Sequence, residues 1–315
     1  MDEFASGALV AAVRKSLAGQ GIPVPAQDST GAALAPGQNA LVPLGTKRAL
    51  LADVARKHGL LPLLRVGQVL PTLPPDPALS ALTAATTPGD LFERWNRLER
   101  FVHSRHRVEV HEVSTTHLVA EHVGRTSRPE PAEDAVVLGV LVALLTMIGT
   151  QEVAVTLEPH GQKVFADNHF TAPAADHGTA LWRFGWSSVP LPAPARQDIR
   201  VDHLDLAERA HQVLSADLPA RWTVQCLAAH LGLSPRTLQR RLQPDGGFAA
   251  VLATARADAA ADLLMNTAHP LGVVGFACGY TDQPHLTREF RRRTAMTPAA
   301  YRTAFARPPE NEATA

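Results

Sequence analysis

The segment from Thr223 to Leu242 constrains the fold more than any other part of the chain. Its first half repeats apolar residues at helical spacing, and Gly232 then permits a tight turn because glycine tolerates a positive φ. Ser234 is a preferred N-cap, and Pro235 follows at the first helical position, where its missing N–H costs nothing. The segment therefore predicts two short helices joined by a tight turn.

The second of these helices has one apolar face and one polar face. Leu233 and Leu238 occupy the two positions of a hydrophobic staple, and Leu238 and Leu242 point inward. The outward face then carries Arg236, Gln239, Arg240 and Gln243. Arginine can read guanine and glutamine can read adenine in the major groove of DNA. The alternative interpretation is a solvated polar helix face with no partner.

A second pattern of the same kind runs from Leu271 to Arg302. Gly279 ends a short apolar helix, Asp282 is the N-cap of the next helix, and Pro284 falls in its first turn, where proline is tolerated. The inward residues are Leu286 and Phe290, and the outward residues are Gln283, His285, Arg288 and Arg292. Thr297 and Pro298 begin a last short helix. The turn and packing residues of the two patterns are Gly232, Ser234, Pro235, Leu238, Gly279, Phe290 and Pro298.

One long alanine-rich helix is predicted between the two patterns, from Phe248 to Met265. A helix of this length is rigid, so it can hold two recognition helices at a fixed distance. Charge is also concentrated in this part of the chain. Residues 221–307 hold 11 arginines, no lysine and 5 acidic residues, although the whole chain has a net charge of zero. A basic region on a mildly acidic body favours nucleic-acid binding over an acidic partner.

These motifs resemble the AraC/XylS family of bacterial transcription regulators. The resemblance rests on residues 233–242, Arg256, residues 278–293 and residues 297–302, and the sequence departs from the family pattern at Gly275, Tyr280, Pro284 and Leu286. It implies an all-α domain with two helix-turn-helix subdomains joined by a long helix, which we place at residues 204–307. It further implies double-stranded promoter DNA as the partner. Arg236, Gln239 and Arg240 match the base-contacting positions of the first recognition helix, and Gln283, His285 and Arg288 match those of the second.

Residues 1–190 predict an α+β domain. Helical spacing covers Thr46 to His58 and the stretch from Thr87 to Phe101, where Leu91, Trp95, Leu98 and Phe101 form one stripe. Strand-like alternation covers 107–113 and 116–123, an apolar helix covers 132–149, and further strands are expected at 152–157 and 180–186. Alternating prolines indicate a linker at residues 191–203, and residues 308–315 are expected to form a disordered tail.

The order of elements in residues 1–190 is similar to the sensor domain of the ornithine-utilisation-regulator type, which is like an arabinose-binding domain. This resemblance implies that the domain senses a small-molecule effector and forms a homodimer. It names no ligand. RNA polymerase is a possible further partner, and the resemblance leaves activation and repression open.

Other functions receive less support from the sequence. Five histidines lie between His103 and His122, which raises the alternative of a metal or haem sensor. The competing interpretation is that these histidines lie at a helix C-terminus and at exposed strand positions and bind nothing. Cys226 and Cys278 lie in apolar helices, so we expect buried packing. No nucleophile motif or phosphate-binding loop is found, so we expect no enzyme activity and no cofactor, with an enzyme fused to a DNA-binding module as the alternative.

The chain is expected to be a cytoplasmic globular protein. Its longest apolar stretch, Ala135 to Ile148, is shorter than the ~18 residues that a membrane-spanning helix requires. The first residues are acidic and lack the basic-then-apolar order of a signal peptide. Two cysteines are too few for a disulfide framework.

Overall fold

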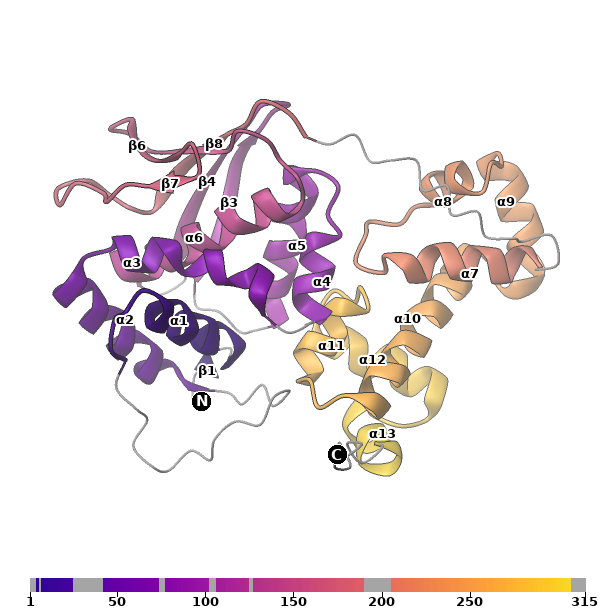
Figure 1. The fold of residues 1–315 in the computed structure, drawn as a ribbon. Helices are drawn as coiled ribbons and strands as arrows, with labels where there is room; N and C mark the ends of the chain where they lie inside the picture. The colour runs from indigo at the N-terminus through magenta and orange to yellow at the C-terminus, as the bar shows by residue number, and fades with distance from the viewer. Residues whose placement is uncertain are drawn as a thin grey trace, which may run out of the picture. The chain divides into compact units, whose positions relative to one another are not determined.

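The computed structural model describes residues 4–5, 7–24, 42–73, 77–101, 106–124, 127–189 and 205–306. The chain divides into two compact units, Met1–Leu191 (unit 1) and Pro192–Ala315 (unit 2), which are described separately (Figure 1). The expected linker at residues 191–203, the tail at 308–315 and His103 lie outside the described residues. None of the described helices is both long enough and apolar enough to cross a membrane.

Unit 1 contains a six-stranded antiparallel sheet. In spatial order its strands are β3 (His106–Val113), β4 (His117–Gly124), β8 (Leu181–Gly185), β5 (Ala154–Leu157), β6 (Gln162–Ala166) and β7 (His169–Phe170). The sheet therefore begins with β3 as an edge strand. A separate pair of short strands is formed by β1 (Phe4–Ala5) and β2 (Val42–Pro43).

The sequence analysis predicted β3, β4, β5 and β8 but named no strand between residues 157 and 180, so it missed β6 and β7. The two strands form a short hairpin, and Asp167 and Asn168 adopt positive φ angles of 51° and 60° in its turn. Asparagine and aspartate tolerate this left-handed conformation better than most residues. Asp167 and Asn168 thus form the corner of the hairpin.

The rest of unit 1, within its described residues, consists mainly of helices. They are α1 (Gly7–Gly19), α2 (Leu44–His58), α3 (Leu61–Leu64), the 3₁₀ helix η1 (Arg65–Thr72), α4 (Pro77–Thr83), α5 (Pro88–Phe101) and α6 (Pro131–Met147). The apolar helix α6 is buried along most of its length. The backbones of α6 and η1 are in direct contact where the two helices cross. A Cβ atom on Gly67 would lie only 2.0 Å from the carbonyl oxygen of Gly139. Only glycine fits at this crossing.

Helix α5 packs against the sheet through Phe92, whose ring centroid lies 5.2 Å from that of Phe184 on β8. The predicted stripe is right for Leu91 and Phe101, which are buried, whereas Trp95 and Leu98 are only half-buried. Arg94 is fully buried instead, because its guanidinium group donates to Asp90 at 3.0 Å and to the carbonyl oxygen of Ala81 at 2.8 Å. These bonds replace the water that a buried charge loses.

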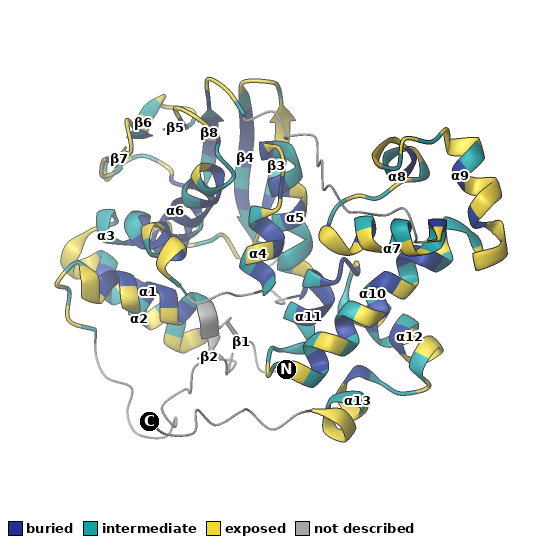
Figure 2. Ribbon diagram, turned by 45° about the vertical axis from the view of Figure 1, so that its right-hand side comes forward, coloured by how far each residue is buried: buried dark blue, intermediate teal, exposed yellow. Residues whose placement is uncertain are grey.

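Unit 2 is entirely helical within its described residues. Its helices are α7 (Leu206–Ala216), α8 (Val224–His230), α9 (Pro235–Leu242), the 3₁₀ helix η2 (Gln243–Asp245), α10 (Gly247–Asn266), α11 (Leu271–Ala277), α12 (Gln283–Thr294) and α13 (Pro298–Phe305). Helix α10 packs against α7, α9, α11, α12 and α13. Figure 2 shows buried and exposed residues alternating along α10, as expected of a helix contacted from several sides. The predicted fold class, α+β followed by all-α, is confirmed.

Candidate nucleic-acid interface

The first helix-turn-helix of unit 2 consists of α8 and α9. Thr223 caps α8 by accepting a hydrogen bond from the backbone N–H of Cys226 at 3.1 Å, and Ser234 caps α9 by accepting from Thr237 at 3.1 Å. Gly232 has a φ of 66° in the turn between them. Each cap satisfies a backbone donor that the first helical turn leaves unpaired, so both helices begin where the sequence predicts.

The outward face of α9 is accessible to a partner. Leu238 and Leu242 are fully buried in the core of this module. Arg236, Gln239 and Arg240 are exposed on the opposite side of the helix. Gln243 is also exposed, but it opens the 3₁₀ helix η2 and does not continue α9. The four side chains predicted from the sequence are therefore all accessible, three of them on one α-helix.

The second helix-turn-helix consists of α11 and α12. Gly279 has a φ of 73°, and a Cβ atom there would lie 2.1 Å from the carbonyl oxygen of Leu218. Asp282 caps α12 by accepting from the backbone N–H of His285 at 2.6 Å. Leu286 and Phe290 are fully buried. The turn of the second module therefore rests directly on the backbone at the end of the α7 segment.

The outward face of α12 is more varied than that of α9. Arg288 and Arg292 are exposed, whereas Gln283 and His285 are half-buried. The Nδ1 atom of His285 accepts from the backbone N–H of Thr281 at 3.3 Å, which assigns the ring hydrogen to Nε2 in the neutral form. Burial, together with the positive charge of Arg256, lowers the pKa of His285. His285 therefore offers a neutral ring whose Nε2–H is a hydrogen-bond donor.

The three arginines near the end of α12 have different surroundings. Arg292 donates to Glu289 at 2.7 Å on the same helix. Arg293 donates to the Thr254 hydroxyl at 2.9 Å and to the Ala250 carbonyl at 3.2 Å, both on α10. Arg291 is exposed and lies three residues after Arg288, on the same side of the helix. Arg291 is thus the one of the three best placed to face DNA together with Arg288.

The role of Arg293 was missed by the sequence analysis, although a signal was present. Arg293 lies seven residues after Leu286 and three after Phe290, so it continues the apolar stripe that faces the scaffold. The aliphatic part of an arginine can lie along such a stripe while its guanidinium group bonds a neighbouring helix. The structure accordingly ties Arg293 to α10.

The two cysteines differ in burial. Cys278 is buried, as expected, and burial raises the pKa of its thiol to about 12. Cys226 is only half-buried, so that part of the prediction was wrong. It lies in the first turn of α8, where its Sγ atom is 3.9 Å from Nδ1 of the exposed His230, one turn further along the helix. The apolar face of this short helix does not extend to Cys226.

Three histidines on β3 and β4 pair with acidic residues. His122 lies 2.7 Å from Asp134, His117 lies 2.8 Å from Glu112, and His111 lies 3.1 Å from Glu121. His106 and His122 are buried with their ring centroids 5.4 Å apart, which corrects the expectation of exposed strand positions. Across the described ranges, no three His, Cys, Asp or Glu side chains are grouped as metal ligands would be.

Comparison with known proteins identifies the helical region. Residues 227–304 match the family model described as a helix-turn-helix domain. An HTH-type transcriptional regulator of Mycobacterium tuberculosis is 37% identical over 76 residues, which are 24% of this chain and 22% of that protein. AdiY of Escherichia coli is 25% identical over 97 residues, which are 30% of this chain and 38% of AdiY.

Among solved structures, the DNA-binding domain of AdpA, in complex with a target DNA, is 30% identical with a TM-score of 0.29, covering 32% of this chain and 94% of that one. The transcriptional regulator CdpR of Pseudomonas aeruginosa is 19% identical with a TM-score of 0.39, covering 93% of this chain and 97% of that one. The chain spans about a fifth of the length of the M. tuberculosis relative it matches.

The capped helix pairs, the exposed arginine faces and the matched residues together define a helix-turn-helix DNA-binding domain. Two such pairs joined by the long helix α10 are the arrangement that the resemblance to the AraC/XylS family implies, and residues 227–304, which match the helix-turn-helix model, contain both pairs.

Proposed function

We propose that the whole protein is a transcription regulator that binds double-stranded promoter DNA through both recognition helices of unit 2. One observation supports this most: α9 and α12 each bury a leucine or phenylalanine stripe, while α9 exposes arginine and glutamine side chains and α12 exposes arginine side chains on the other face. The proposed base-reading and backbone-positioning residues are Arg236, Gln239, Arg240, Gln243, Gln283, His285, Arg288 and Arg292.

Arg240 and Arg288 are the proposed base readers, because each lies near the centre of the outward face of its helix. An arginine that bonds O6 and N7 of guanine discriminates against other bases by about 1–3 kcal/mol. In addition to the residues above, we propose Arg291 as a phosphate contact, because it is exposed on the same side of α12 as Arg288. A phosphate contact adds affinity for every DNA sequence alike and adds to the salt dependence of binding.

The test compares the full chain with Arg240→Ala and Arg288→Ala on a panel of promoter DNAs that differ at single base pairs. Each variant should lose about 10- to 100-fold affinity for the best site and lose its preference at one position. Arg241→Ala is the control, since Arg241 is exposed next to Arg240 but turned from the centre of the face. A variant that weakens all DNAs equally, and keeps their ranking, would contradict base reading by that residue.

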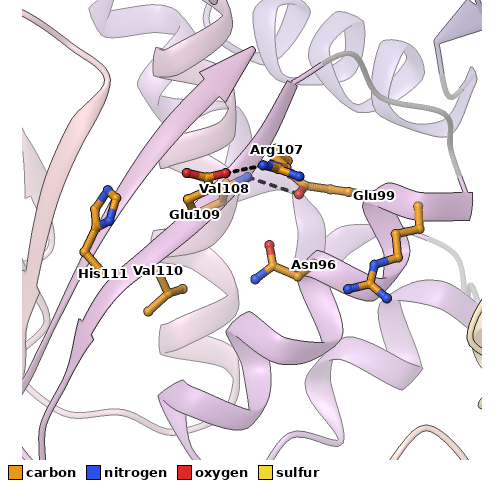
Figure 3. Close-up of a pocket in the computed structure, with 8 residues that line it drawn as sticks. Asn96, Glu99, Arg107, Val108, Glu109, Val110 and His111 are labelled. Atoms are coloured by element: carbon orange, nitrogen blue, oxygen red, sulfur yellow. Dashed lines mark hydrogen bonds and ion pairs between the residues drawn. The ribbon is translucent and has the colours of Figure 1, made fainter. Parts of the chain in front are cut away.

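For unit 1 we propose effector sensing and homodimerisation, with RNA polymerase as a further partner of the complete protein. Support for effector binding comes from a hollow of about 500 Å³ between α5 and β3, which is within the size range of small-ligand sites. Figure 3 shows Asn96 pointing into the open space, with Glu99 reaching across toward β3 beside Arg107. An added effector should change the affinity of the full chain for DNA, measured by titration with and without it.

A further inference from the structure

The hollow of unit 1 follows the edge of the sheet (Figure 3). One wall is a flank of α5 that carries Asn96, Glu99 and Arg100, and the other is the run of consecutive residues Arg107–His111 on β3. Successive side chains of a strand point to opposite faces of the sheet. Consecutive residues can therefore line the same hollow only where it lies along the edge of the strand, beside its backbone.

The backbone of β3 at this edge is open to pairing. The N–H of Val108 points away from β4, because it donates to Oε2 of Glu99 at 3.1 Å. Backbone groups of alternate residues in an antiparallel strand point the same way, so the C=O of Val108 and both groups of Val110 also face the hollow. Within the part of the chain that the structure describes, β3 pairs with β4 alone.

Glu99 already imitates a neighbouring strand at one position. Its second oxygen accepts from Nε1 of Trp95 at 2.7 Å, so the carboxyl group is held from two sides. Its Oε2 atom therefore sits where the carbonyl oxygen of an added strand would lie. A register shift between Val110 and Glu112 ends the regular edge on the other side. The outward backbone groups that remain are the C=O of Val108 and both groups of Val110, which is enough to hold the centre of a peptide of a few residues.

We propose that this hollow binds an extended peptide segment, which adds to the sheet as a strand beside β3. Strand addition draws affinity from main-chain hydrogen bonds and specificity from alternate side chains. The proposal names an effector class for unit 1 and rests on the proposed function only for its consequence in DNA binding.

Charge on β3 defines the pattern of the peptide. Arg107, Glu109 and His111 alternate along one face of the strand, where Arg107 and Glu109 form an ion pair and His111 pairs with Glu121. Opposite charges facing each other across two strands stabilise the pairing, and like charges destabilise it. The peptide therefore carries a base opposite Glu109, apolar residues on either side of that base, and an acid beyond them toward Arg107.

The first experiment uses the full chain and two blocked, fluorescently labelled peptides, Asp-Val-Lys-Val-Asp and Lys-Val-Asp-Val-Lys. Each order of charges reads the same in both directions, so the test does not depend on strand direction. Fluorescence anisotropy should show the first peptide binding at least about 10-fold more tightly than the second. Hydrogen exchange should slow at the amide of Val110 when the first peptide is bound. Equal binding of the two peptides, or no binding of either, would overturn the proposal.

Two variants locate the site. Val110→Pro removes the outward N–H and should weaken the first peptide at least about 10-fold, while proline at an edge position leaves the sheet intact. The double variant Arg107→Glu with Glu109→Lys should bind the second peptide in preference to the first. Circular dichroism and thermal unfolding report whether each variant is folded. A folded Val110→Pro variant with unchanged peptide affinity would contradict strand addition.

The two proposals fail separately. A peptide that binds without changing the affinity for promoter DNA keeps the site and contradicts its role as an effector. DNA binding that is normal while neither peptide binds leaves the function of unit 2 in place and removes the site on β3.

Discussion

Tyr280 carries a buried hydroxyl group that has no hydrogen-bond partner among the described residues. Burial raises the pKa of this phenol, so it stays protonated under all ordinary conditions. An unsatisfied buried polar group costs roughly 1–3 kcal/mol. Tyr280→Phe should therefore leave the free energy of unfolding unchanged or raise it by about 1 kcal/mol, measured by urea denaturation. A clear loss of stability would mean that the hydroxyl group has a partner.

The protonation of Glu99, in the hollow of unit 1, should make the stability of the protein depend on pH. Withdrawal from water is the main cause that raises its pKa from 4.5 to about 7. Between these values the unfolded chain has released the proton and the folded chain has kept it, so stability falls as pH rises through this range. Glu99→Gln should abolish this fall, which we expect to be about 1–3 kcal/mol at most.

Melting temperatures of the wild type and of Glu99→Gln at pH 5 and pH 7.5 provide the measurement. The melting temperature of Glu99→Gln, relative to that of the wild type, should be higher at pH 7.5 than at pH 5. Trp95→Phe is a useful control, because it removes one of the bonds to the carboxylate and should steepen the pH dependence. Parallel curves for the wild type and Glu99→Gln would show that Glu99 titrates normally.

At the scale of elements, the turns of the two modules provide a matched comparison. Gly232 and Gly279 have similar positive φ angles, 66° and 73°. A Cβ atom meets nothing within 4 Å at Gly232 but lies 2.1 Å from the Leu218 carbonyl at Gly279. Gly232→Ala should cost about 1 kcal/mol of stability from backbone strain alone. Gly279→Ala should cost clearly more in thermal unfolding, and equal losses would contradict the close approach.

The end of α12 gives a second comparison between neighbours. Arg293→Gln should lower the stability of unit 2, because it removes the bonds to Thr254 and Ala250 on α10. Arg291→Gln should leave stability unchanged and reduce the salt dependence of DNA binding by about one counterion. Thermal unfolding and DNA titrations at several salt concentrations measure both. A reversal of the two results would exchange the roles assigned to these arginines.

Local signals predicted the elements of unit 2 well. Thr223, Ser234, Asp282 and Thr297 all act as the caps of their helices, because a cap depends on a few neighbouring residues. The burial of Arg94 and the contacts of Arg293 with α10 were not predicted, because the Ala81, Thr254 and Ala250 partners come from other helices that the local sequence does not reveal. The buried pair His106 and His122 was misjudged for the same reason, as burial on a strand depends on what covers the sheet.

At the scale of the whole molecule, the fold class could be predicted from the change in sequence pattern between the two regions. The β6–β7 hairpin and the hollow beside β3 could not, because both depend on which segments lie side by side in three dimensions. The base-reading residues of α9 and α12 remain predictions, as do the linker at 191–203 and the homodimer. Their common consequence is a footprint on DNA that is set by the distance between two recognition helices on one scaffold.

The most direct test is hydroxyl-radical footprinting of promoter DNA with residues 204–307 and with the full chain. Two recognition helices held by α10 must enter successive major grooves, about 34 Å or one helical turn apart. We therefore expect two protected blocks about 10 base pairs apart, unlike in sequence because α9 and α12 offer different side chains, with bending of the DNA between them. A single short palindromic half-site, read by one helix, would contradict the account and show that Gly275 and Pro284 have disabled the second module.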